Sequence, residues 1–255
     1  MKKKTLGIII VSVLGAAAIF CSAMFTHQYL DAKNSKAAFD DLTNLITEID
    51  EPQKDAEAEE SGLSVEELAA AEAALAHEKY AALFAQNNDF IGWIRIDGTN
   101  VNYPVMQTKN NPNFYLKHNF EKEYSDLGVP YIQEDCDLAT SDNLIIYGHH
   151  IKGQKMFGAL EDYKSESFYE KHKTIQFDTL TEQAEYEIIA VFKTVAYSAE
   201  GYRYYDFVDA ENEEEFNAYV GKCKELALYD TGVTAEYGDR LITLSTCELM
   251  WYKKS

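Results

Sequence analysis

One cysteine of the chain has the setting of a nucleophile. Cys247 ends the alternating segment Leu241–Cys247, which predicts a β-strand with Thr243, Ser245 and Cys247 on its more polar face. A thiol at the end of a strand, beside hydroxyl side chains, can be reached by a substrate. Cys247 is therefore the candidate for nucleophilic chemistry, which requires a thiolate.

The other three cysteines are less suited to attack a substrate. Cys21 lies in the apolar N-terminal run, and Cys223 lies on the apolar face of a predicted helix, where we expect a buried structural thiol. Cys136 lies in an acidic turn whose carboxylates disfavour a thiolate. No two cysteines have C-x-x-C spacing, so we expect neither a zinc ribbon nor a thioredoxin motif.

A nucleophilic cysteine needs an imidazole partner, and His149 and His150 are the best placed. They follow the apolar run 143–147 and Gly148, an arrangement that can present an imidazole at the end of a buried strand. Adjacent residues of an extended chain point to opposite faces, so the two make a poor metal pair, and we expect no metal or other cofactor. The other histidines lie in N-terminal or polar segments, where solvated side chains are the default: His27, His77, His118 and His172.

Many short strands and few helices must position these candidates. The predicted strands are 91–99 with a turn at Asp97–Gly98, 101–106, 129–132, 143–147, 174–177, 186–192 and 240–246. Helical patterns cover 64–86, 156–164 and 211–228, and Ser64 with Glu67 forms a capping box that opens the first of them. This organisation predicts a mostly-β barrel or sandwich.

The N-terminus carries three lysines followed by a mostly apolar run. Residues 6–25 are long enough, at about 1.5 Å per residue, to span a hydrocarbon core of roughly 30 Å. We predict a cytoplasmic tip and transmembrane anchor over residues 1–28, rather than a cleaved signal peptide or a lipoprotein at Cys21. An acidic linker over 29–63 and a folded catalytic domain over 64–255 then lie outside the cell.

The charge balance excludes one class of partner. The chain has 23 Lys and Arg against 43 Asp and Glu, a formal net charge of −20. Nucleic-acid binders gain affinity by neutralising phosphates with basic side chains, so we expect no nucleic-acid partner. The hydrophobic fraction of 46% is that of a folded chain rather than a disordered one.

Several motifs together resemble the sortases. Ile146–His150 followed by Met156–Leu160 is similar to their histidine segment, and Thr243–Cys247 (T-L-S-T-C) is similar to their nucleophile motif. Upstream, the segments 92–96, 98–107 and 113–116 resemble class B members of the family. The resemblance covers roughly residues 80–247 and includes the N-terminal anchor. Papain-like proteases place Cys before His, whereas here His precedes Cys.

The resemblance implies a fold and a reaction. It implies an eight-stranded β-barrel with extra N-terminal helices, anchored to the membrane of a Gram-positive cell. It implies a cysteine transpeptidase in which Cys247 attacks the C-terminal sorting motif of a secreted protein and His149 acts as acid and base. The resulting thioester is resolved by an amine of a peptidoglycan precursor or of a pilin subunit. A hydrolase that uses water as acceptor stays open, and the resemblance gives His150 no role.

The chain departs from the family pattern after Cys247. The family has an arginine several residues beyond the nucleophile, on a last strand, whereas the eight residues after Cys247 include no arginine. We therefore expect either that the sequence is truncated, the interpretation we favour, or that the protein is an impaired, sortase-like binding protein. The arginines elsewhere in the chain are Arg95, Arg203 and Arg240.

Overall fold

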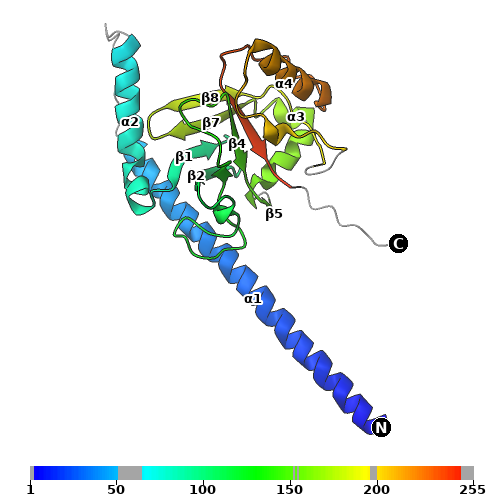
Figure 1. The fold of residues 1–255 in the computed structure, drawn as a ribbon. Helices are drawn as coiled ribbons and strands as arrows, with labels where there is room; N and C mark the ends of the chain where they lie inside the picture. Colours follow the sequence, from blue (N-terminus) through cyan, green and yellow to red (C-terminus); the bar gives the residue numbers. More distant parts are fainter. Residues whose placement is uncertain (1–2, 51–64, 152, 154, 196–199, 248–255) are drawn as a thin grey trace.

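The computed structural model describes residues 3–50, 65–151, 153, 155–195 and 200–247 (Figure 1). The helices are α1 (Lys3–Asp50), α2 (Val65–Gln86), η2 (Phe114–Leu116), η3 (Phe157–Lys164), α3 (Glu166–Tyr169), η4 (Tyr204–Asp206) and α4 (Glu213–Leu226). The strands are β1 (Phe90–Arg95), β2 (Asn102–Met106), β3 (Tyr131–Ile132), β4 (Asn143–Tyr147), β5 (His150–Ile151), β6 (Lys155–Met156), β7 (Thr174–Thr179), β8 (Gln183–Glu187) and β9 (Leu241–Ser245).

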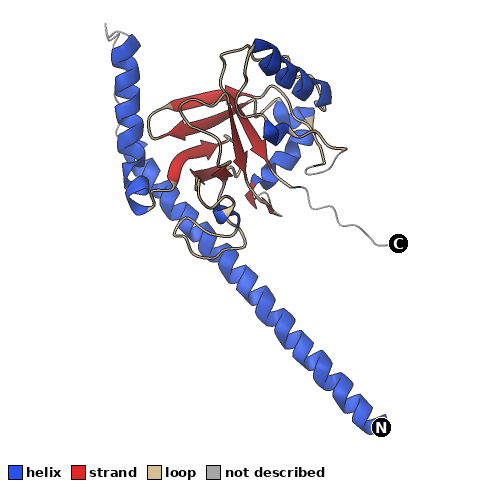
Figure 2. Ribbon diagram, in the orientation of Figure 1, coloured by secondary structure: helices blue, strands red, loops and turns tan. Residues whose placement is uncertain are grey.

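Seven of these strands form one curved sheet in the order β8-β7-β1-β2-β3-β4-β9 (Figure 2). Neighbours are antiparallel except for β2 with β3 and β4 with β9, which are parallel. The β1–β2 hairpin confirms the predicted turn, because Gly98 has φ +74° and the Ile96 amide donates to the Val101 carbonyl at 2.9 Å. That left-handed conformation is one that glycine adopts without a Cβ clash.

An ion pair links the two edges of this sheet. Among the described residues, β8 and β9 are the edge strands. Arg240 directly precedes β9 and lies 3.2 Å from the carboxylate of Glu182, which directly precedes β8. The sheet therefore curls until its first and last strands approach each other, which is the geometry of a nearly closed barrel.

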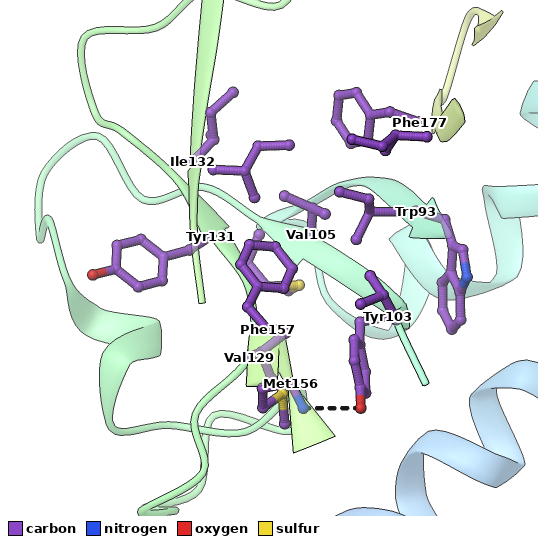
Figure 3. Packing of buried hydrophobic residues seen from close by; sticks show 14 of the residues in the cluster. Trp93, Tyr103, Val105, Val129, Tyr131, Ile132, Met156, Phe157 and Phe177 are labelled. Atoms are coloured by element: carbon purple, nitrogen blue, oxygen red, sulfur yellow. Dashed lines mark hydrogen bonds between the residues drawn. The ribbon is translucent and has the colours of Figure 1, made fainter. Parts of the chain in front are cut away.

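The interior of the barrel is filled by large side chains. In β4 the first four residues are buried, as the apolar run predicts for a strand covered on both faces. Phe157 is fully buried and lies among Val105, Val129 and Met156 (Figure 3). Figure 3 also shows the Tyr103 hydroxyl accepting the Met156 amide at 3.0 Å, which joins β2 to the short β6.

The N-terminal helix differs from the sequence prediction. α1 runs unbroken from the apolar segment to Asp50, so residues 29–50 of the predicted acidic linker are helical. Phe39, Leu42 and Ile46 are buried in the main core cluster, because this part of α1 packs on the domain. Residues 51–63 of the predicted linker lie outside the described residues. The domain boundaries themselves stay a prediction.

In the part of the chain that the structure describes, no helix is both long enough and apolar enough to cross a membrane. The structure therefore does not support the transmembrane helix predicted over 6–25. The helix containing that run does not end with it but continues through Lys33, Asp40 and Asp41. Location at the membrane stays a prediction from the sequence alone.

The other elements agree with the sequence in type more than in bounds. α2 confirms the predicted helix 64–86, although its cap Ser64 lies outside the described residues. α4 confirms the helix predicted over 211–228; the Asn212 side chain caps it by accepting the Glu215 amide at 3.1 Å. The segment 157–164 is a 3₁₀ helix, and the strand predicted over 186–192 ends at Glu187.

Candidate active site

Two parallel strands bring the predicted nucleophile and its predicted partner to the same end of the sheet. β4 and β9 pair in register from Asn143 with Leu241 to Tyr147 with Ser245. The contact continues past the strands, since the Gly148 amide donates to the Ser245 carbonyl at 3.0 Å and Thr246 Oγ1 donates to the Gly148 carbonyl at 2.8 Å. His149 directly follows Gly148, and Cys247 directly follows Thr246. Parallel strands end at the same edge, so the pairing brings residues 149 and 247 to the same end of the sheet.

Gly148 lets the chain turn from β4 into His149 beneath an aromatic ring. A Cβ at Gly148 would lie 2.6 Å from two ring carbons of Phe157. The Phe157 amide in turn donates to the His149 carbonyl at 3.0 Å. The glycine that the sequence places before the histidine is thus explained by the close approach of a buried ring.

The half-buried imidazole of His149 has a defined hydrogen-bond partner. Its Nε2 lies 2.7 Å from the backbone carbonyl oxygen of Leu116, in η2. A carbonyl only accepts, so Nε2 carries the hydrogen in this contact. Nδ1 is then the nitrogen left to exchange protons with a reacting group.

The polar face of β9 carries a row of hydroxyls, as the alternation predicts. The Thr243 hydroxyl donates to Asn143 Oδ1 at 2.9 Å and lies 3.1 Å from the Tyr219 hydroxyl. The Ser245 hydroxyl lies 2.6 Å from the Tyr204 hydroxyl. These contacts hold β9, which ends two residues before Cys247. Their partners Asn143, Tyr204 and Tyr219 were not among the site residues predicted from the sequence. Asn143 could have been found from the sequence, because it is a polar residue at the start of an otherwise apolar strand.

The cysteines of the folded part differ in burial, and the burial predicted for Cys223 is confirmed. Cys247 is exposed, whereas Cys136 and Cys223 are buried. Burial raises the pKa of the Cys136 thiol to about 11, with smaller contributions from nearby carboxylates such as Asp135. Burial likewise raises the pKa of the Cys223 thiol to about 11. From the sequence we predicted that acidic neighbours lower the reactivity of Cys136. In the structure, burial is the larger cause of its raised pKa.

Two other histidines of the folded part, His150 and His118, have structural contacts. His150 lies 2.8 Å from Glu161, which also pairs with Lys164 at 2.9 Å. His118 stacks on Phe114 with ring centroids 3.8 Å apart, and the structure thus places it against an aromatic ring rather than in solvent. Within the described residues, no cluster of three His, Cys, Asp or Glu side chains could hold a metal ion.

The arginines named by the sequence each pair with a carboxylate. Arg95 pairs with Asp97 at 3.0 Å, Arg203 with Asp206 at 2.6 Å, and Arg240 with Glu182 at 3.2 Å. Arg203 precedes Tyr204, whose hydroxyl contacts Ser245 in β9, and Arg240 directly precedes β9. Residues 248–255 and any partner there lie outside the described residues, so the expectation of a missing last strand and arginine stays a prediction.

A family model, a curated relative and solved structures all relate this chain to the sortases. The sortase domain model matches residues 94–255. Sortase B of Staphylococcus aureus is 36% identical over 171 residues, which cover 67% of this chain and 68% of that protein. A Staphylococcus aureus sortase B–substrate complex superposes with a TM-score of 0.72 at 28% identity, covering 89% of this chain and 94% of that one. A sortase B structure complexed with triglycine superposes with a TM-score of 0.68 at 29% identity, covering 84% of this chain and 90% of that one.

Proposed function

Because the chain belongs to the sortase family of cysteine transpeptidases, we propose that it cleaves a C-terminal sorting motif of secreted proteins and transfers the cleaved protein to an amine. The family and the nearly closed β-barrel expected from the sequence are both confirmed. The observation that carries the proposal is the parallel pairing of β4 with β9, which sets His149 and Cys247 at one edge.

The proposed reaction has two acyl-transfer steps. The thiolate of Cys247 attacks the carbonyl carbon of the threonine in the sorting motif, and the tetrahedral intermediate collapses to a thioester as the amide C–N bond breaks. His149, as imidazolium, protonates the departing amine. The acceptor amine then attacks the thioester, His149 removes its proton, and the C–S bond breaks to regenerate the thiolate.

Two relatives support the substrate and acceptor classes. One related sortase B structure is a substrate complex, and another is complexed with triglycine. A short glycine peptide offers a free amino group, which is the nucleophile that the second step requires. For this chain we infer an amine acceptor of the same kind, from a peptidoglycan precursor or a pilin subunit.

The second candidate is a sortase-like protein that binds sorting motifs without turnover. It is favoured by the pairing of Arg95, Arg203 and Arg240, the arginines of the described residues, with carboxylates, since acyl transfer needs donors at the developing oxyanion. A missing donor of this kind costs about 10²–10³ in rate. Binding would then persist while the thioester failed to form.

The test is direct detection of each product. The full chain is incubated with a panel of sorting-motif peptides, with and without triglycine, and analysed by mass spectrometry. We expect an acyl-enzyme on Cys247 and a peptide–triglycine product, both lost in Cys247→Ala. Cys21→Ala, which changes another exposed thiol, should retain them. A hydrolysed product despite triglycine would identify a protease, and peptide binding without a thioester would identify the binding protein.

A further inference from the structure

The carbonyl that contacts His149 belongs to a backbone segment whose direction is fixed on both sides. The Tyr115 carbonyl accepts the Val129 amide at 3.0 Å, and the Lys117 carbonyl accepts the Ser125 amide at 3.0 Å. Leu116 lies between these two held peptides, and its own carbonyl meets His149 Nε2 at 2.7 Å. The acceptor is therefore presented by a rigid turn rather than by a mobile side chain.

A buried polar network holds this turn against the core. Tyr115 is fully buried; its hydroxyl accepts Asn87 Nδ2 at 2.8 Å and donates to Asp89 at 2.9 Å. Asn113 opens η2 in the left-handed conformation, with φ 65°, and its side chain accepts the Tyr131 hydroxyl at 2.8 Å. The buried hydrogen bond between Tyr115 and Asn87 resists displacement, because breaking it would leave a polar group without water.

Gly128 lies directly behind the same carbonyls. A Cβ at Gly128 would lie 2.4 Å from the Tyr115 carbonyl oxygen and 2.8 Å from the Leu116 carbonyl oxygen. Both atoms are backbone, so they could make room only if the turn moved. The absence of a side chain at Gly128 is thus what allows the Leu116 carbonyl to occupy its place.

We propose that the Leu116 carbonyl, backed by Gly128, is a positioning element that fixes the tautomer of His149. This tautomer makes Nδ1 the atom that transfers protons, an inference that rests on the proposed function. Since a carbonyl cannot donate, Nε2 keeps its hydrogen in both protonation states of the ring. Neutral His149 then offers the Nδ1 lone pair as the base, and the imidazolium offers Nδ1–H as the acid. The same carbonyl stabilises the imidazolium, which gives up a proton in the first step and forms again in the second.

The tautomer can be read without substrate. The full chain is labelled with ¹⁵N-histidine, and the His149 ring nitrogens are assigned by their loss in His149→Gln. At a pH where His149 is neutral, we expect Nε2 to be the protonated nitrogen and Nδ1 the unprotonated one. The opposite tautomer would overturn the proposal. Failure of the chain to form a thioester would sink the proposed transpeptidase while leaving this measurement intact.

A matched pair of glycine variants tests the backing of the carbonyl. Gly128→Ala and Gly232→Ala both place alanine at a left-handed position, with φ +59° and +74°, but a Cβ at Gly232 meets nothing within 4 Å. We expect Gly128→Ala to shift His149 toward a mixture of tautomers and to lower kcat roughly 10- to 100-fold with little change in KM, as for a misplaced catalytic group.

Gly232→Ala should keep both the tautomer and kcat. Equal effects of the two variants on the His149 signals would assign any loss to backbone strain and contradict the backing role. If Gly128→Ala does not fold, the wild-type tautomer alone decides whether the Leu116 carbonyl fixes the ring.

Discussion

Substitution of Gly148 by alanine tests the packing that sets the direction of His149. The residue does not have positive φ, so alanine can adopt its backbone conformation. The strain would come from overlap, with the new Cβ 2.6 Å from two ring carbons of Phe157 and 3.0 Å from a third. Phe157 is fully buried and its amide is bonded to the His149 carbonyl, so the ring has no open space to move into.

Overpacking a close-packed interior costs about 1–3 kcal/mol, because neighbouring side chains and backbone must shift. We expect Gly148→Ala to lower the free energy of unfolding by this amount, with a shift in Tm of about 2–4 °C per kcal/mol for a domain of this size. Turnover should fall as well, because the displaced peptide carries His149. Urea denaturation with an unchanged m-value would show that the change is in stability and not in the unfolded state.

A double-mutant cycle with Phe157→Leu isolates the overlap. Phe157→Leu alone removes ring atoms from the core and should cost about 1–2 kcal/mol. In the double variant the smaller side chain at position 157 gives the new methyl group at position 148 space, so the combined cost should fall short of the sum by about 1 kcal/mol or more. Costs that add within about 0.5 kcal/mol would show that the two sites are independent and refute the reasoning.

Two further predictions concern the thiols and the β9 contacts. With a pKa of about 11, Cys136 and Cys223 are about one part in a thousand thiolate at pH 8, so iodoacetamide should label the exposed thiols of Cys21 and Cys247 before these two. Labelling of the two buried thiols should rise only as the pH approaches 11, and comparable rates at pH 8 would contradict their burial. Tyr204→Phe removes the 2.6 Å contact with Ser245 and should lower the unfolding free energy by about 0.5–1.5 kcal/mol in urea. An unchanged midpoint would show that this hydroxyl contact contributes nothing.

The sequence predicted the strands of the site well because their patterns are strong. β4 is a run of apolar residues, which is typical of a strand covered on both faces, and β9 alternates between apolar and hydroxyl residues. The order of the two strands in the sheet could not be derived from those patterns. The resemblance to a known family implied a barrel and paired His149 with Cys247 in one reaction, but the strand order comes from the structure.

The partner of His149 was beyond the reach of the sequence for a physical reason. Every residue has a backbone carbonyl, so nothing in the residue type of Leu116 distinguishes its oxygen as a ligand of an imidazole. The packing of α1 was missed for a different reason. Phe39, Leu42 and Ile46 are spaced as one helical face, but they directly precede the acidic run from Glu48 onward that favoured the linker interpretation.

The pairing of β4 with β9 has a consequence for how the protein folds. Gly148 and Thr246, which bond to each other at the end of this ladder, are 98 residues apart in the chain. Closing a loop of that length costs chain entropy before any contact rewards it, so this pairing should form late and slowly. Until it forms, the thiol and the imidazole belong to separate parts of a collapsing chain. Reactivity is therefore expected to arise with the final docking of β9, so a partly folded chain would carry the cysteine without its acid and base.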